Sequence, residues 1–271
     1  MSNEDQIEYW NDNAGVKWTE QQDVMDALLA PVTSLLMDAA AIVPGERVLD
    51  IGCGTGETSL IAIDAGADVT GVDVSEPMLE LARLRANGRG TLLLADASEY
   101  QAEEGFDLIM SRFGVMFFED PVSAFINIKA NLKPGGRMVF ACWQSPKVNL
   151  WVMVPMAAIK PLLPDAPETD PHAPGPFAFA DAERLKSILT EAGFEDVSMT
   201  SHSVEICLSQ TGGVDDAVYF SSQIGPASRA LGEVDDNLKS RLLTALKKAL
   251  APHDEGGRVA LPGGIWIVRA R

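Results

Sequence analysis

Three acidic residues stand at the ends of three predicted strands, in a pattern that suits a nucleoside site. Asp50 lies within LDIGCGTG, Asp73 ends VTGVD, and Asp96 ends LLLAD. Carboxylates accept hydrogen bonds, so these three could bind a cationic amine, the two hydroxyls of a ribose and the exocyclic amine of an adenine. Asp50 could instead organise its own loop. The pattern favours binding of a positively charged nucleoside that carries no phosphate.

A glycine turn lies between the first predicted strand and the helix after it. Gly52, Gly54 and Gly56 follow the spacing G-x-G-x-G, which gathers backbone N–H groups at a helix N-terminus. The dinucleotide fingerprint is G-x-G-x-x-G, and the carboxylate of Glu57 would repel a pyrophosphate there. An NAD-dependent oxidoreductase is therefore the less favoured class. We interpret Glu57 as a first-turn acid favoured by the helix dipole.

The elements that must position these residues alternate between strands and helices. Apolar runs predict strands at 47–52, 68–74, 91–97, 106–114 and 137–143, and helical spacing predicts helices at 56–66, 75–87 and 120–136. This alternation is typical of a parallel sheet covered on both faces. Ser75 is the expected N-cap of the helix 75–87. Residues 6–41 are expected to be helical, with Pro31 splitting or kinking the stretch.

The second half of the chain follows a looser pattern. We expect a proline-rich insertion at 144–180 with a short helix at 149–162, a helix at 181–194, a strand at 196–209, two helices within 213–251 and a final strand, or a pair broken by Pro-Gly-Gly, at 257–271. The predicted fold is α/β: a Rossmann-like, seven-stranded, mostly parallel sheet with one antiparallel strand near 257–270.

These segments predict one domain, 1–271, with helical lids around a cofactor-binding core. Its expected parts are an N-terminal helical lid at 1–43, the core at 44–143, a proline-rich lid at 144–180, and the C-terminal part of the sheet at 181–271 with a helical insertion at 213–251. The inserted helices are also the candidate surface for a homodimer.

Composition narrows the function classes further. The 271 residues carry a formal charge of −18, which argues against nucleic acid and anionic membranes as partners. The three cysteines form no C-x-x-C and no H-E-x-x-H occurs, so we expect neither a disulfide framework nor a bound metal. No apolar run is long enough to span a membrane, and MSNEDQIEYW lacks the features of a secretory signal. A cytoplasmic location is expected.

The chain resembles the class I S-adenosylmethionine-dependent methyltransferases, and most of all their UbiE-like, type 11, small-molecule branch. The motifs that carry the resemblance occur in order over roughly residues 40 to 145: VLDIGCGTG, VTGVDVSEPMLELAR, LLLADA, FDLIMSRFGVMFF and LKPGGRMVFACW. The resemblance implies S-adenosyl-L-methionine as the cofactor, S-adenosylhomocysteine as its product, and a Rossmann-like fold.

The resemblance also implies which residues bind the cofactor. Asp50, Gly52, Cys53 and Gly54 would bind its amino-acid end, and Asp73 would hold the ribose hydroxyls. Adenine would contact Val74, Met78, Asp96 and Ala97, and the methionine part would be covered by Ser111, Arg112 and Phe113. The remaining expected cofactor residues are Trp18, Gly56 and Ser98.

The methyl acceptor should lie under segments that the core does not need. Their aromatic and methionine-rich composition favours a small, apolar or aromatic acceptor, with substrate-binding residues expected at Met116, Phe117, Trp151 and Phe177. A general base is required only if the acceptor atom must lose a proton. The candidate catalytic residues are His172 as the base, Tyr219 as a hydrogen-bond donor, and Arg112, which could orient an acidic substrate or pair with Glu119 or Asp120. The alternative function is a protein of this fold that binds S-adenosylmethionine in a non-methylating or regulatory role.

Overall fold

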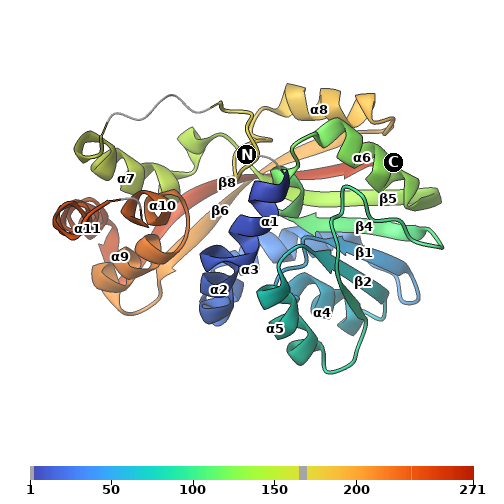
Figure 1. The fold of residues 1–271 in the computed structure, drawn as a ribbon, viewed down its shortest axis with the longest axis horizontal. Coiled ribbons are helices and arrows are strands. Elements are labelled where there is room, and N and C mark those ends of the chain that lie inside the picture. Colours follow the sequence, from blue (N-terminus) through green and yellow to red (C-terminus); the bar gives the residue numbers. More distant parts are fainter. Residues whose placement is uncertain (1–2, 165–169, 233) are drawn as a thin grey trace. The chain divides into compact units, whose positions relative to one another are not determined.

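The computed structural model describes residues 3–164, 170–232 and 234–271 (Figure 1). Their contacts divide the chain into two compact units. The first unit comprises Met1–Gln144, Pro171–His202 and Ile265–Arg271, and the second comprises Ser145–Asp170 and Ser203–Gly264. Each unit is discontinuous in sequence, because the chain leaves the first unit and returns to it twice.

The sheet is mostly parallel. Its strands β1 (Arg47–Ile51), β2 (Asp68–Asp73), β3 (Thr91–Leu94), β4 (Phe106–Arg112) and β5 (Leu132–Trp143) belong to the first unit, whereas β6 (Ser198–Ser209) and β8 (Arg258–Ala270) have residues in both units; the strand order is β3-β2-β1-β4-β5-β8-β6. β1 pairs in parallel with both β2 and β4, while β8 runs antiparallel to β5. The predicted mixed α/β sheet with an antiparallel final strand is confirmed. A two-residue strand, β7 (Asp254–Glu255), also pairs with β8 and makes the sheet eight-stranded.

Helices flank this sheet in Figure 1, and three more precede it in the chain. The flanking helices are α4 (Glu57–Asp64), α5 (Glu76–Ala86), α6 (Pro121–Ala130) and α8 (Ala182–Glu191); the N-terminal ones are α1 (Asn3–Asn11), α2 (Asn13–Glu20) and α3 (Gln22–Ala40). Pro31 lies inside α3 and does not split it. Its side chain is on the exposed face, while Leu28, Val32 and Leu36 bury the opposite face and hold the helix across the proline. The breaks between these helices fall at Asp12 and Gln21 instead.

The LKPGG segment was expected to end a helix, and this prediction is wrong. α6 ends at Ala130, and β5 already begins at Leu132, which pairs with Phe106. Pro134 cannot donate to a ladder and Gly135 has φ +80°, so the register shifts before Leu108 pairs with Arg137. The segment is therefore an irregular strand entry rather than a helix end.

The second unit has an apolar core of its own. Its helices are α7 (Leu150–Ile159), α9 (Gly213–Gln223), α10 (Pro226–Gly232) and α11 (Asp236–Leu250). Leu242 and Leu246 of α11 are fully buried against Ile159 and Leu231. The described residues of 213–251 form three helices and not two, because Gly225, with φ +87°, and Pro226 separate α9 from α10.

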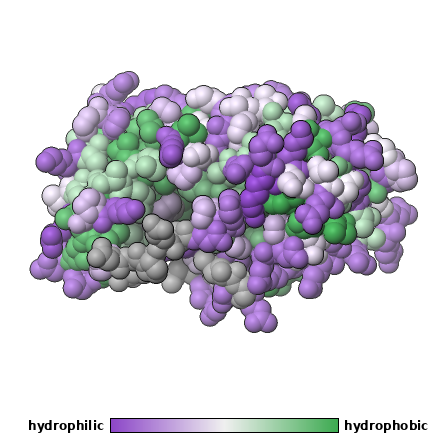
Figure 2. All heavy atoms as spheres, turned by 90° about the horizontal axis from the view of Figure 1, so that it is seen from above, coloured by the Kyte–Doolittle hydropathy of each residue, from purple (hydrophilic) through white to green (hydrophobic). Residues whose placement is uncertain are grey.

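Short 3-10 helices complete the described chain: η1 (Gly114–Phe117), η2 (Pro146–Val148), η3 (Lys160–Leu162) and η4 (Ala251–His253). Hydrophilic side chains cover much of the face shown in Figure 2, with apolar side chains between them. Within the described ranges, no helix combines the length and the apolar character that a membrane crossing requires.

Truncation of Leu246 tests the core of the second unit. We expect Leu246→Ala to lower the free energy of unfolding by about 3 kcal/mol, because a fully buried leucine leaves a cavity. Leu243→Ala on the same helix is the control, since Leu243 is only partly buried and should cost about 1 kcal/mol. Urea denaturation of both variants measures the difference, and equal losses would contradict this core.

Candidate active site

Two backbone turns meet at the carboxyl ends of β1 and β4. Gly52 has φ +65°, and a Cβ there would lie 2.7 Å from the Cα of Gly114. A Cβ on Gly114 would lie 2.6 Å from the carbonyl oxygen of Ile51. Neither turn can accept a side chain at this contact, so glycine is required by close approach at both positions and by a positive φ at Gly52.

The turn after β4 is tied to β1 by a buried serine. The hydroxyl of Ser111 donates to the carbonyl of Ile51 at 2.7 Å and accepts from the amide of Gly114 at 3.1 Å. Phe113 follows with φ +69°, which is rare for a bulky residue. Its ring stacks on Trp143 with centroids 4.3 Å apart, and its amide donates to Ala141 at 3.0 Å. These contacts hold a strained backbone next to the glycine turn.

Asp50 is fully buried at the end of β1. The hydroxyls of Thr58 and Ser59 both donate to its Oδ2 at 2.6 Å, whereas Oδ1 has no hydrogen-bond partner among the described residues. Burial raises the pKa of Asp50 to about 6, because a buried carboxylate loses its hydration. A buried carboxylate oxygen that lacks a partner fits a cationic amine, the group that the sequence assigns to it.

Asp73 ends β2 and holds the turn from its other side. Its Oδ2 accepts from the amide of Gly54 at 2.7 Å, and its Oδ1 accepts from the amide of Ser75 at 2.9 Å. Burial raises the pKa of this carboxyl as well. Each carboxylate oxygen can accept a second hydrogen bond, so the pair of ribose hydroxyls remains within its capacity.

Two further cofactor candidates, Cys53 of the glycine turn and Met78 of α5, are buried beside glycines. A Cβ at Gly71 would lie 3.0 Å from Sγ of Cys53, so the thiol has room because Gly71 has no side chain. Burial raises the pKa of its thiol well above the usual value, which leaves it unreactive. The sulfur of Met78 would lie 3.8 Å from a Cβ at Gly54.

Asp96 follows β3 and forms a small polar cluster. Its Oδ1 accepts from the amide and hydroxyl of Ser98 at 2.8 and 2.7 Å, and its Oδ2 accepts from Nδ2 of Asn3 at 2.5 Å. The carbonyl of the neighbouring Ala97 accepts from Asn127 at 3.2 Å. The first residue of α1 thus reaches the acid predicted to bind adenine, a contact that the sequence did not reveal.

The end of α1 is bound to the turn between β2 and α5. Asn11 donates to the carbonyl of Val74 at 2.8 Å and accepts from the amide of Glu76 at 3.0 Å. Ser75 stands at the N-cap of α5, as predicted, but its hydroxyl donates to the carbonyl of Trp10 and does not cap the helix. The N-terminal helix therefore lies against the expected adenine side of the site.

Aromatic side chains connect the N-terminal helices α1 and α2 to η1. Trp10 makes edge contacts with Trp18 and Phe117, with ring centroids 6.1 and 5.3 Å apart. Met116 beside Phe117 is buried, and its carbonyl accepts from the amide of Gly175, two residues before Phe177. The structure thus joins Trp18 and Phe117 through Trp10, and it ties the loop that carries Phe177 to Met116.

The other candidates are His172, Tyr219 and Trp151. His172 is exposed in the loop that precedes α8, and Tyr219 on α9 is 57% exposed. Trp151 is the second residue of α7, and both it and Tyr219 belong to the second unit. In the part of the chain that the structure describes, no group of three His, Cys, Asp or Glu side chains is placed to hold a metal ion.

Glu57 is the residue that sequence reasoning undervalued. It begins α4, as its interpretation as a first-turn acid requires, but its Oε2 is buried without a hydrogen-bond partner among the described residues. Nη1 of Arg112 lies 3.9 Å from this oxygen and donates to the hydroxyl of Thr33 at 2.6 Å. The signal in the sequence was an acid directly after a glycine turn, but its partner on β4 could not be inferred.

A second ion pair joins this buried cluster. Asp26 pairs with Arg85 at 2.6 Å and lies close to the carboxyl of Glu57. Burial and the nearby carboxyl of Asp26 raise the pKa of Glu57 to about 7, and burial lowers the pKa of Arg112. Asp26, Glu57, Arg85 and Arg112 thus form a partly buried charge cluster beside the glycine turn.

The fold and this site together define a Rossmann-like nucleoside-cofactor protein. Glycines and strand-end acids meet where β1 separates β2 from β4, which is the switch point where open α/β sheets bind their ligands. A family model described as "Methyltransferase domain" matches residues 49–140.

Proteins with similar sequences and structures identify the family more closely. A demethylmenaquinone methyltransferase of Clavibacter sepedonicus is 34% identical over 170 residues, which cover 59% of this chain and 69% of the relative. An uncharacterised protein of Mycobacterium tuberculosis is 29% identical over 217 residues, or 78% of this chain and 76% of that one. The YcgJ protein of Bacillus subtilis shares the fold, with a TM-score of 0.57 at 17% identity over 88% of this chain and 96% of that chain. The chain belongs to the class I S-adenosylmethionine-dependent methyltransferases, in their UbiE-like branch.

The pH dependence of unfolding tests the buried carboxyl of Asp50. Its pKa rises from 3.8 to about 6 on folding, so the native state holds this proton more tightly than the unfolded chain does. Its contribution to stability is present below about pH 4 and is lost as the pH rises through 6. We expect Asp50→Asn to gain up to about 3 kcal/mol relative to the parent between about pH 4 and 7.5, as measured by urea denaturation.

Asp107→Asn is the matched control for this measurement. Lys133 and the amide of Arg47 hold the pKa of Asp107 below its usual value, so its stabilising effect is present at neutral pH and is lost on acidification. The control should therefore lose stability relative to the parent as the pH rises. A pH-independent difference for Asp50→Asn would refute the buried-charge description.

Substitution of Gly52 tests the contact between the two turns. We expect Gly52→Ala to cost about 3 kcal/mol or more, because the methyl group would collide with the backbone of Gly114 at a positive φ. Gly45→Ala is the control, since Gly45 also has a positive φ but a Cβ at that position would have open space for 4 Å around it. Thermal unfolding compares them, and equal losses would mean that close approach contributes nothing.

Proposed function

We propose that this protein transfers the methyl group of S-adenosylmethionine to a small organic acceptor that is apolar or aromatic. The observation that carries the cofactor assignment is the buried Oδ1 of Asp50, which lacks a hydrogen-bond partner among the described residues and lies beside a turn of three positive-φ glycines. A carboxylate in that position is stabilised by the ammonium of an amino acid, and the glycine turn leaves room for a ligand to approach the backbone.

The other two acids, Asp73 and Asp96, would bind the ribose and the adenine of the cofactor. Asp73, which is held rigidly by two backbone amides, would accept from the ribose hydroxyls. Asp96, which is oriented by Ser98, would accept from the adenine amine. Gly52, Cys53, Gly54 and Gly56 would line the amino-acid end, and Val74, Met78 and Ala97 the adenine. Ser111 and Phe113 stand on the turn that meets the glycine turn.

A bound sulfonium cofactor supplies a methyl group that is already attached to a good leaving group. The protein must therefore orient the acceptor in line with the methyl group and exclude water. The aromatic chain from Trp18 through Trp10 to Phe117 provides an apolar cover on the first unit. The side chain of Arg112 is only 11% exposed, so water would compete little with a ligand anion that it orients.

The nature of the acceptor rests on the side chains expected to contact it. Met116, Phe117, Trp151 and Phe177 are apolar or aromatic, which favours an acceptor of the same kind. The relatives named for demethylmenaquinone support a small-molecule acceptor. His172 stays the candidate base, which is needed only if the acceptor atom loses a proton, and Tyr219 stays a candidate hydrogen-bond donor. The homodimer and the cytoplasmic location stay predictions.

The ribose assignment is tested by Asp73→Asn. An amide nitrogen cannot accept a hydrogen bond, so we expect the affinity for S-adenosylmethionine, measured by calorimetry, to fall about 10- to 100-fold. Asp107→Asn is the matched control, because Asp107 also accepts a backbone amide but lies near the amino end of β4. Unchanged affinity in Asp73→Asn would remove Asp73 from the site.

Catalysis is tested separately from binding. Incubation of the parent protein with methyl-labelled S-adenosylmethionine and a metabolite extract should give a labelled small molecule and S-adenosylhomocysteine. Tight binding of the cofactor with no labelled product would favour the non-methylating alternative, and recovery of NAD from the protein would contradict the cofactor assignment.

A further inference from the structure

An arginine on α5 holds the glycine turn from outside. Nη1 of Arg85 donates to the carbonyl oxygen of Thr55 at 2.7 Å. Thr55 stands between Gly54 and Gly56, which both have a positive φ, and only 7% of its surface is exposed. Glycine restricts rotation of the backbone less than other residues do, so the bond from Arg85 constrains a part of the turn that is otherwise free to rotate.

The peptide unit between Thr55 and Gly56 is held at both of its polar groups. The amide of Gly56 donates to the carbonyl of Cys53 at 2.9 Å, and the carbonyl of Thr55 accepts from Arg85. Among the described residues, no backbone amide donates to this carbonyl, so the guanidinium takes the place of a backbone partner. A carbonyl of a buried residue requires a donor. Loss of Arg85 would therefore let this peptide unit rotate toward another donor.

Asp26 of α3 holds the other side of the guanidinium. Nη2 of Arg85 donates to Oδ2 of Asp26 at 2.6 Å, and the side chain of Gln22 donates to the same carboxylate. The side chains of Arg85 and Asp26 are only 23% and 16% exposed. A planar guanidinium that bonds two acceptors through separate N–H groups keeps one orientation. The chain of contacts from α3 to the glycine turn lies within the first unit.

We propose that Arg85 is a positioning residue for the amino-acid end of S-adenosylmethionine, and that Asp26 fixes its orientation. The inference rests on the proposed assignment of that end of the cofactor to the glycine turn. Arg85 acts through the backbone of Thr55, because a turn that binds a ligand with its backbone loses affinity when one peptide unit rotates. Helix α3, which the sequence assigned to a lid, thereby supports cofactor binding.

Two ligands distinguish positioning of the turn from general support of the fold. S-adenosylhomocysteine carries the amino-acid end, whereas methylthioadenosine has the same nucleoside and sulfur without it. We expect Arg85→Leu to weaken binding of S-adenosylhomocysteine at least about tenfold in calorimetry. Binding of methylthioadenosine should stay within about twofold of the parent. Equal weakening of both ligands, or parent affinity for S-adenosylhomocysteine, would overturn the proposal.

Arg83→Leu is the matched control on the same helix. Arg83 also donates to a backbone carbonyl, that of Leu92 at 3.2 Å, and it also pairs with an acid, Glu76, at 2.8 Å. These partners lie on β3 and at the start of α5, and neither belongs to the glycine turn. The affinity of this variant for S-adenosylhomocysteine should stay within about twofold of the parent.

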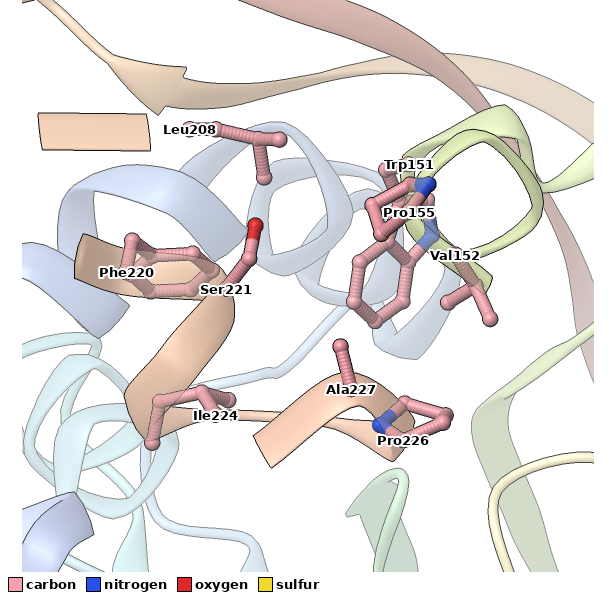
Figure 3. Close-up of a pocket in the computed structure, with 9 residues that line it drawn as sticks. All are labelled: Trp151, Val152, Pro155, Leu208, Phe220, Ser221, Ile224, Pro226 and Ala227. Carbon is pink, nitrogen blue, oxygen red and sulfur yellow. The ribbon is translucent and has the colours of Figure 1, made fainter. Parts of the chain in front are cut away.

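A second control separates lost stability from lost positioning. Phe220 of α9 is buried beside a small apolar pocket of the second unit, which Trp151 and Leu208 also line (Figure 3). The described residues that line this pocket carry no charge. Phe220→Leu should lower stability in urea denaturation and leave the affinity for S-adenosylhomocysteine within about twofold of the parent. A loss of affinity equal to that of Arg85→Leu would mean that stability alone explains the effect.

A double-mutant cycle tests the link to α3. Asp26→Asn removes the charge that holds the guanidinium, so it should weaken binding of S-adenosylhomocysteine about threefold or more. The variant that combines Asp26→Asn with Arg85→Leu should bind no more weakly than Arg85→Leu alone, because both changes break one chain of contacts. Additive losses would contradict the link.

Arg85→Lys replaces Arg85→Leu in these measurements if the leucine variant does not fold. Lysine keeps the charge but lacks the planar fork that bonds Thr55 and Asp26 together, so the affinity for S-adenosylhomocysteine should fall about threefold or more. Parent affinity in Arg85→Lys would overturn the proposal in that case.

Asp50→Asn distinguishes failure of this proposal from failure of the proposed function. If Asp50→Asn weakens binding of S-adenosylhomocysteine and Arg85→Leu does not, the positioning role fails and the assignment of the amino-acid end stands. If neither variant changes the affinity, the assignment of that end to the glycine turn fails, and the positioning role fails with it.

Discussion

The backbone contact between Gly52 and Gly114 is the constraint on which the candidate site depends. It lets the ends of β1 and β4 approach without side chains between them, and the hydroxyl of Ser111 spans the remaining gap to Ile51. Phe113 adopts a positive φ directly before Gly114 and is held by Trp143. With larger residues at the two glycines, the strand-end acids would not share one crevice.

Burial of charge is the second constraint, and it follows from the first. Asp50 and Glu57 lie behind the glycine turn, and each keeps one oxygen without a hydrogen-bond partner among the described residues. Desolvation of these carboxyls costs stability, which is only partly offset by Thr58, Ser59 and Arg112. A ligand that supplies a positive charge at this place would recover part of that cost, and this links the stability of the protein to occupancy of the site.

Local pattern was enough to predict most elements of the first unit. The alternation of apolar runs with helical spacing predicted β1, β2, α4 and α5 within a few residues, and Asp181 caps α8 as its type suggests. Of the two alternatives for the C-terminus, the structure has the single strand, because β8 continues through Pro262 and pairs with β5. The errors arose where packing overrides local preference. α3 is not split at Pro31, because its opposite face is buried. The LKPGG segment begins strand β5 rather than ending a helix, because Leu132 pairs with Phe106 of β4.

The sequence by itself determined the donor end of the site: glycines at fixed spacing, an acid at each of three strand ends, and hence the class of cofactor. These features are local, because each depends on a few consecutive residues and on the strand that carries them. Only the tertiary structure decided that Asn3 contacts Asp96, that Glu57 meets Asp26 and Arg112, and that Trp151 faces an uncharged pocket. Such contacts join segments far apart in the chain, and their formation depends on how helices pack, which residue types alone do not encode.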